Sequence, residues 1–207
     1  LDSESAEQRP ALGLPAVDAV SAAYNLGANA IDIVYADGAK VQWLRWSLAS
    51  QSVIDNAELA ATSSTCIDVE INPATGEPGV CYHFADRTRY REFDGSSWSV
   101  EELVDNSVVN SLPFDLRFAH GTRYLSCTVD TGYSALYEYD AGASAWDQRN
   151  TPAILALGGQ DVTIVQGSTP GEILLLDRDA SDDVHLLSLL PGDNSSVLET
   201  YESSIPQ

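Results

Sequence analysis

Residues 80–93, VCYHFADRTRYREF, contain the pattern from which the fold can be predicted, because this pattern recurs along the chain. Tyr90 and Phe93 follow Tyr82 by eight and eleven residues. The same offsets recur in three further segments, at Tyr35, Trp43 and Trp46, at Thr128, Leu136 and Tyr139, and at Val165, Ile173 and Leu176. Four copies at similar spacing predict one supersecondary unit that is used four times.

The second copy has the pattern of four short strands joined by turns. Apolar and polar residues alternate over 66–71, and runs rich in β-branched or aromatic residues follow at 79–84, 88–93 and 98–104. The turn sequences NPATG at 72–76 and DGSS at 94–97 separate these runs. Short strands between Gly, Asn and Asp turns are typical of an antiparallel meander. Four such strands in about 40–47 residues have the size of one propeller blade.

We therefore predict an all-β fold, a β-propeller of four-stranded antiparallel blades in a single domain. The four expected blades span residues 15–58, 59–110, 111–151 and 152–193. In the last blade, strands are expected at 153–157, 162–166, 172–176 and 184–190. Residues 1–14 and 194–207 are left over, and together they could close the ring or build a composite fifth blade, because closure removes open sheet edges. A third alternative is a partial propeller that is completed by another copy or by a larger assembly.

The second and third copies resemble a propeller blade repeat of secreted bacterial proteins, distantly similar to sialidase-type blades. The resemblance rests on Tyr82 in the second strand, on Tyr90 and Phe93 in the third, and on an Asp-Gly…Trp turn. That turn occurs at Asp94, Gly95 and Trp98 and again at Asp140, Gly142 and Trp146. The Ser-x-Asp-x-Gly-x-Thr-Trp string of sialidases is missing, so the resemblance implies a fold and no activity.

The composition argues against two classes of partner. The chain has 207 residues, with 31 acidic against 10 basic side chains and a formal charge of −21. Phosphate backbones and anionic lipid surfaces are bound through Lys and Arg, so nucleic acid and membrane surfaces are poor expectations. No apolar run reaches the length that inserts into a bilayer. An acidic surface and an N-terminus that resembles a processed end favour an extracellular, secreted protein.

Two of the three cysteines flank the hairpin turn at residues 72–77. Cys66 and Cys81 stand near mirror positions on adjacent antiparallel strands. Side chains at such positions can lie within bridging distance, so a disulfide between them is expected. Buried, reduced thiols are the alternative.

The acidic loop at 177–183 is the candidate metal site. Asp177, Asp179, Ser181 and Asp183 place oxygen atoms at alternating positions, as in loops that bind calcium. The match is partial, because Asp182 stands where such loops have Gly. A solvated acidic turn is the alternative interpretation, and calcium is the only cofactor that the sequence indicates.

Two groups of side chains are candidates for ligand binding. The aromatic residues Tyr124, Tyr133 and Tyr137 fall out of phase with the repeat, so they are expected to be exposed as stacking platforms. The other group is Arg87, Arg89 and Arg91, which alternate along one strand and form a local positive stripe. Pairing of these arginines with nearby carboxylates is the alternative.

No catalytic constellation stands out, since the chain has no nucleophile elbow, phosphate-binding loop or metal-ligand histidine pair. The function predicted is therefore a secreted, non-catalytic module that recognises a carbohydrate or a protein partner. The alternatives are a small hydrolase or lyase with carboxylates or histidines at an axial mouth, and a structural subunit that completes a propeller by homo-oligomerisation.

Overall fold

The computed structural model describes residues 16–62, 64–84, 87–105, 115–129, 133–149, 161–178, 184–189 and 196–201. At positions 105, 128, 129, 133, 134, 161, 177 and 196–201 it describes the backbone alone. All regular elements in these ranges are β-strands. The described residues contain no helix of the length and apolarity that crossing a bilayer requires.

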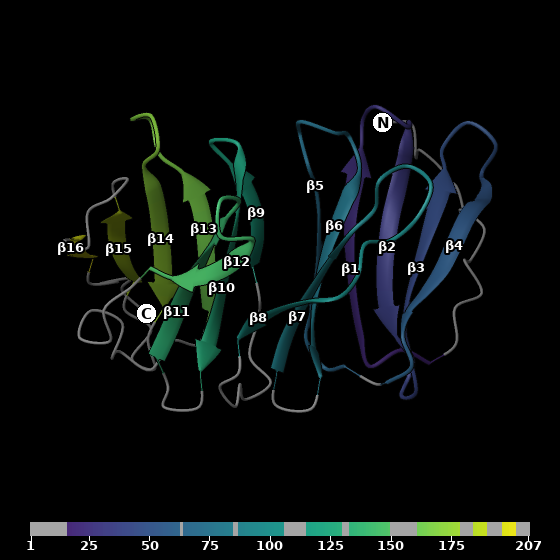
Figure 1. The fold of residues 1–207 in the computed structure, drawn as a ribbon, viewed down its shortest axis with the longest axis horizontal. Helices are drawn as coiled ribbons and strands as arrows, with labels where there is room; N and C mark the ends of the chain where they lie inside the picture. Colours follow the sequence, from purple (N-terminus) through teal and green to yellow (C-terminus); the bar gives the residue numbers. More distant parts are fainter. Residues whose placement is uncertain are drawn as a thin grey trace, which may run out of the picture.

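The strands form four antiparallel four-stranded sheets, each built from four consecutive strands (Figure 1). Sheet one contains β1 (Ala19–Asn25), β2 (Ala30–Ala36), β3 (Val41–Ser47) and β4 (Ser52–Ala60). Sheet two contains β5 (Ile67–Ile71), β6 (Pro78–Phe84), β7 (Arg87–Glu92) and β8 (Glu102–Asp105). Sheet three contains β9 (Asp115–Ala119), β10 (Thr122–Val129), β11 (Tyr133–Asp140) and β12 (Ala145–Gln148). Sheet four contains β13 (Asp161–Gln166), β14 (Ile173–Arg178), β15 (Val184–Leu189) and β16 (Ser196–Tyr201).

This architecture confirms the predicted fold class of antiparallel, four-stranded blades. The sheets follow one another in chain order along the long axis of the molecule, with sheet one and sheet four at opposite ends (Figure 1). The first strands of neighbouring sheets contact one another, β1 with β5, β5 with β9, and β9 with β13. We call β1, β5, β9 and β13 the inner strands.

The fourth copy of the sequence pattern is one strand out of phase. In the first three copies the pattern joins the second and third strands of a sheet, whereas Val165 and Ile173 lie on β13 and β14, the first and second strands of sheet four. Residues 196–201, which were set aside as material for a fifth blade, pair with β15 as the outer strand of sheet four. The strand expected at 153–157 lies outside the described residues. Both β13 and β14 are rich in aliphatic residues, so the offsets alone could not distinguish them.

The Asp-Gly turns that the resemblance identified connect the third and fourth strands. Asp94 Oδ1 accepts hydrogen bonds from the backbone amides of Ser96 (2.8 Å) and Ser97 (2.7 Å), and Gly95 has a positive φ of 91°. These hydrogen bonds, led by that from the Ser96 hydroxyl, lower the pKa of Asp94 to about 2. Asp140 receives the amide of Gly142 in the same way, at 2.7 Å. Both turns therefore hold an aromatic residue in place just after the turn.

Three apolar cores lie between the four sheets. We call the space between sheets one and two the first junction, that between two and three the second junction, and that between three and four the third junction. Their buried centres include Trp43 with Val80, Tyr90 with Leu125, and Leu136 with Leu175. Large side chains, many of them the aromatic residues of the repeated pattern, fill the gap between stacked sheets.

Hydrogen bonds tie the inner strands together at a fixed interval. The backbone amides of Val69, Leu116 and Ile164 each donate to the side chain of the preceding inner strand. The acceptors are Ser21 (3.3 Å), Asp68 (2.8 Å) and Asp115 (2.5 Å). Each donor follows its acceptor by 48 or 49 residues. We call this series the inner ladder, and it shows that the sheets are repeats of one unit in space.

Candidate functional site

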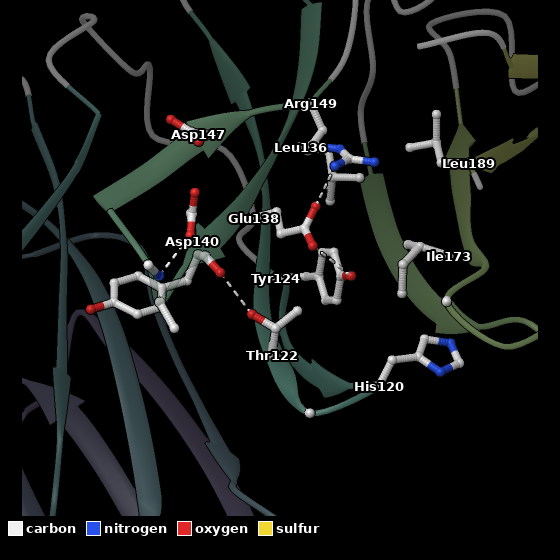
Figure 2. A pocket seen from close by; sticks show the side chains of 15 residues that line it. His120, Thr122, Tyr124, Leu136, Glu138, Asp140, Asp147, Arg149, Ile173 and Leu189 are labelled. Atoms are coloured by element: carbon white, nitrogen blue, oxygen red, sulfur yellow. Dashed lines mark hydrogen bonds and ion pairs between the residues drawn. The ribbon is translucent and has the colours of Figure 1, made fainter. Parts of the chain in front are cut away.

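A cavity of about 550 Å³ opens in the third junction (Figure 2). Sheet three contributes most of its lining, from β10, β11, the turn after β11 and the end of β12. The residues that line it from sheet three include His120, Thr122, Tyr124, Leu136, Glu138, Asp140, Asp147 and Arg149. Sheet four contributes Gly171, Ile173 and Leu189. The cavity therefore has a largely polar wall on one sheet and an apolar wall on the other.

Glu138 is the centre of the polar wall. Its carboxylate accepts a hydrogen bond from the Tyr124 hydroxyl at 3.1 Å and forms an ion pair with Arg149 at 2.8 Å (Figure 2). Tyr124 and Glu138 are opposite one another on β10 and β11, and Arg149 follows β12. Burial, followed by the nearby Glu138 charge, raises the pKa of Tyr124 to about 12. Tyr124 therefore remains a hydrogen-bond donor at neutral pH.

Two further polar contacts shape the rim of the cavity. His120, in the β9–β10 turn, contacts the backbone carbonyl of Glu172 across the junction, with Nε2 at 3.0 Å. Thr122 donates to the carbonyl of Tyr139 at 2.8 Å. His120 and Gly121 both have positive φ, 50° and 81°, so the turn is tight and brings the imidazole to sheet four. Of the two contacts, that of His120 links sheet three to sheet four at the cavity.

The second junction is filled at the same level. Arg123 extends from β10 toward sheet two, and its guanidinium lies 3.5 Å from the ring centre of Tyr139 and 4.6 Å from that of Tyr90. Arg123 pairs with Glu102 at 3.2 Å, and the Trp146 indole donates to the same carboxylate at 3.1 Å. Cation–π contacts and a charge-assisted hydrogen bond thus occupy the space with the protein's own side chains.

The first junction is also filled by an arginine, which here comes from the first of its two sheets and reaches toward the second. Arg45 of β3 binds Asp32 at 2.9 Å and reaches Glu77 of sheet two at 2.8 Å. Its guanidinium lies 5.4 Å from the Trp43 ring centre and 5.6 Å from that of Phe93. The Asp32 side chain is fully buried, and the charge of Arg45 compensates its carboxylate within the junction.

Strand register explains why the third junction stays open. Three positions on each sheet face the preceding sheet at this level, and we call them the rim triplet. The rim triplets are Pro78, Phe93 and Trp98 in sheet two, Arg123, Tyr139 and Trp146 in sheet three, and Ile173, Leu189 and Ser196 in sheet four. Sheet four therefore has Leu189 and Ser196 where sheets two and three have an aromatic pair. The missing ring volume corresponds to the position of the cavity.

The tyrosines that the sequence selected are not exposed platforms. Tyr124 and Tyr137 are 6% and 4% exposed, so the expectation of exposure is wrong for both. Tyr137 packs in the second junction, because its strand turns it to the face opposite that of Glu138. Tyr124 does line the cavity, and its hydroxyl contacts Glu138 there. The side chain of Tyr133 lies outside the described residues.

The three arginines of the predicted stripe lie at alternate positions of β7, but two of them already bind other groups of the protein. Arg89 pairs with Glu101 at 2.5 Å, and Arg91 donates to the backbone carbonyls of Leu59 and Ser99 at 2.7 and 2.9 Å. Arg87 is exposed at the start of β7. Ion pairing and backbone contacts thus account for Arg89 and Arg91, and their ligand-binding role stays a prediction.

The expected disulfide is wrong. Cys66 and Cys81 are both buried thiols. In the register of β5 and β6, Cys81 is opposite Asp68, and the carbonyl of Cys66 accepts the amide of His83. The two cysteines are therefore offset by two residues along the ladder, which is a diagonal and not a facing pair. Burial raises the pKa of both thiols, most strongly for Cys81.

The candidate calcium loop cannot be placed. Asp179, Ser181 and Asp183 lie outside the described residues, and only the backbone of Asp177 is described, on β14. Within the described ranges no group of three or more His, Cys, Asp or Glu side chains has the arrangement of a metal site. Calcium binding by this loop stays a prediction, which a rise in melting temperature in millimolar calcium over chelator would support.

Comparison with known proteins supports the fold. No protein family matches the sequence, and no curated protein matches it. The structure is similar to the BP39L lectin from Burkholderia pseudomallei, with a TM-score of 0.64 and 12% identity over 88% of this chain and 54% of that one. The SapL1 lectin, solved in complex with alpha methyl fucoside, has a TM-score of 0.59 and 15% identity, over 91% of this chain and 62% of that one. Hydrazine synthase of Kuenenia stuttgartiensis has a TM-score of 0.62 and 11% identity, over 96% of this chain and 53% of that one.

These similarities show that the chain has a propeller-type fold. Identities of 11–15% are evidence for the fold alone, and the three proteins differ in what their names say they do. The chain spans 53–62% of the length of these structures. The site must therefore be argued from its own residues.

Sequence reasoning missed the two residues that organise the cavity, Glu138 and Arg149. A signal for the open junction was nevertheless present. The Asp-Gly…Trp turn follows the third strand in sheets two and three, whereas sheet four has LPGDNSS after Leu189 with no aromatic residue. Sheet one lacks the motif as well, but it has no preceding sheet among the described residues, so among the three junctions the missing motif marks the third as the one without the aromatic pair.

Proposed function

We propose that the protein is a non-catalytic carbohydrate-binding module whose sugar site is the cavity in the third junction. The observation that carries the proposal is the pairing of a Glu138–Arg149–Tyr124 wall with an apolar wall of Ile173 and Leu189. Similarity in fold to two lectins supports it as an analogy.

The chemistry of the two walls suits a sugar ring. Neighbouring hydroxyl groups can donate to the carboxylate of Glu138 and accept from the guanidinium of Arg149, which gives orientation and specificity. The C–H face of the same ring can lie on Ile173 and Leu189, because burial of apolar surface there is favourable. A volume of about 550 Å³ is within the range of small-ligand sites.

Charge narrows the class of sugar. Glu138, Asp140 and Asp147 line the cavity beside a single arginine, and the whole chain has a charge of −21. This field repels sialylated, sulfated and uronic-acid glycans. Neutral sugars are therefore the expected ligands, and an acidic, secreted lectin is the setting we propose.

A hydrolase is not favoured by any specific observation. The best-placed carboxylates outside the cavity are Asp68 and Asp115 on the inner strands, and both accept backbone amides of the inner ladder. Burial raises the pKa of Asp68, but its oxygen atoms already serve the contacts between sheets. These groups have a structural role that is sufficient to explain them.

A glycan array that includes neutral and anionic sugars tests the proposal. Glu138→Gln and Arg149→Met should each weaken binding at least tenfold while the melting temperature stays within a few degrees, because both side chains are partly exposed at the cavity. Arg87→Met is the matched control, since Arg87 is an exposed arginine on sheet two. Binding lost in Arg87→Met and kept in Arg149→Met would place the ligand on the arginine stripe. No binding to any glycan would refute the proposal.

A further inference from the structure

The face of sheet one that points away from sheet two is apolar and only partly covered. Ile33, Tyr35 and Leu44 are buried on it, and Trp46 packs against them. Beside them, Val20 and Tyr24 of β1 are 57% and 54% exposed. Exposed apolar side chains that form a contiguous sheet face are characteristic of an interaction surface.

The same face is covered in the other three sheets. By the inner ladder, Val20 of sheet one corresponds to Val162 of sheet four, and the two are 57% and 5% exposed. Trp46 corresponds to Phe93 of sheet two, which is 5% exposed in the first junction, and Val53 corresponds to Trp98. Sheet one thus presents a complete rim triplet of Ile31, Trp46 and Val53, with no preceding sheet among the described residues to receive it.

Among the described residues, the inner ladder also has two open ends. The amides that donate to a preceding sheet are those of Val69, Leu116 and Ile164, and the equivalent residue of sheet one is Ala22. At the other end, Thr163 of sheet four occupies the position of the acceptors Ser21, Asp68 and Asp115. Thr163 donates to Asp115, and its oxygen retains the capacity to accept. The two ends are therefore complementary to each other.

We propose that sheet one docks onto sheet four of a second copy of this chain, head to tail. The Ala22 amide then donates to Thr163 of the second copy and continues the inner ladder. Val165, Leu174 and Leu186 form the outward face of sheet four, and Val165 is 42% exposed. These aliphatic residues complement the aromatic face of sheet one in volume, as the leucines of the third junction do with Tyr124.

One general fact agrees with a second copy as the occupant. Propellers contain from four to eight blades, so two chains of four sheets stay within the range. Head-to-tail contacts close into a ring when the rotation permits, and the second contact of a closed dimer repeats the first.

The molar mass in solution, measured by light scattering after gel filtration, tests this proposal independently of glycan binding. The expected mass is twice the 22.2 kDa of one chain. Val20→Lys should return the mass to that of one chain, because it places a charge on the docking face. Val100→Lys is the control, since Val100 is 86% exposed and lies after the third strand of sheet two, on neither end face.

Cross-linking tests the head-to-tail direction. A mixture of the Ala22→Cys and Val165→Cys variants should form a disulfide-linked dimer on oxidation, and neither variant should do so alone. The three native cysteines are buried and do not compete. A single-chain mass at every concentration, or equal masses for Val20→Lys and wild type, would overturn the proposal.

Discussion

The second and third junctions are built from the same positions on consecutive sheets, yet only the second is filled. At its rim, Arg123 lies between Tyr139 and Tyr90 and pairs with Glu102. At the equivalent level of the third junction, Ile173 and Leu189 leave a cavity in front of Glu138. Both junctions keep an apolar centre, in which Leu125 and Leu175 are fully buried.

The difference separates two tasks within one repeat. The centre of a junction must be packed because it supplies the contact between sheets that holds the fold. The rim can be filled or left open at lower cost, because it lies next to solvent. A repeat protein can thus acquire a binding site by loss of bulky rim residues in one copy, with no change in backbone architecture.

The largest expected effect comes from emptying a filled junction. Trp43 is 1% exposed, packs on Phe93 and Trp98, and donates to Asp32. Trp43→Ala should lower the free energy of unfolding by about 3–5 kcal/mol, because it leaves a cavity and removes one of the hydrogen bonds to the buried Asp32 carboxylate. Leu189→Ala, beside the existing cavity, should cost about 2 kcal/mol. Urea denaturation measures both, and equal costs would mean that the two junctions do not differ in packing.

The next effect compares two arginines. Arg123 is sandwiched between rings and its side chain is 13% exposed, whereas the Arg149 side chain is 26% exposed at the cavity. Arg123→Met should cost about 2–4 kcal/mol, because it removes the ion pair with Glu102 and the cation–π contacts with Tyr90 and Tyr139 in the junction. Arg149→Met should cost about 1 kcal/mol or less. Thermal and chemical denaturation of both variants measure these losses of unfolding free energy. A smaller loss for Arg123→Met than for Arg149→Met would contradict the expected order.

Alkaline pH should reveal the burial of the cavity tyrosine. Tyr124 ionises near pH 12 in the folded protein and near pH 10 when unfolded. The unfolded state therefore releases its proton first, and the free energy of unfolding falls as pH rises from 10 to 12. Tyr124→Phe lacks this contribution, so its decline over that window should be smaller by about 1–2 kcal/mol. Identical pH profiles of the two proteins would show that Tyr124 is solvated.

Filling the open junction should be nearly neutral for stability. Ile173→Arg together with Leu189→Tyr reproduces two members of the rim triplet of sheet three next to Glu138. The unfolding free energy should change by less than about 1 kcal/mol, with a gain if the side chains fill the cavity. Differential scanning calorimetry measures the change. A loss above about 2 kcal/mol would mean that the space of the two junctions is not equivalent.

The smallest expected effect concerns the thiols. Because Cys66 and Cys81 are not bridged, reductant should leave the melting temperature unchanged. A clear fall in melting temperature on addition of dithiothreitol would instead show that a disulfide contributes to stability. Counting the thiols in urea gives the same answer chemically, and three reactive groups are expected.

Much of the fold could be predicted from the sequence. Runs of β-branched and aromatic residues between Asp-Gly and Asn-Pro turns are local signals, and they place most strands of sheets one to three correctly. Sheet four was misphased because β13 and β14 are both aliphatic, so no aromatic marker fixes which strand is which. The outer strand β16 was separated from its sheet for the same reason.

The site was harder to predict because it depends on neighbours that are distant in sequence. Tyr124 and Tyr137 differ in role only because β10 and β11 turn them toward different junctions. Cys66 and Cys81 miss one another by a register offset that the hairpin sequence does not specify. Glu138 is one of 31 acidic residues, and only its contacts with Tyr124 and Arg149 single it out.

The most direct test of the open-junction account is a glycan-array measurement on the wild-type protein beside the Ile173→Arg/Leu189→Tyr variant. The account predicts that the wild type binds neutral glycans and that the variant, folded and equally stable, loses this binding. Unchanged binding by the variant, at a cavity that its side chains occupy, would contradict the claim that the third junction is the site.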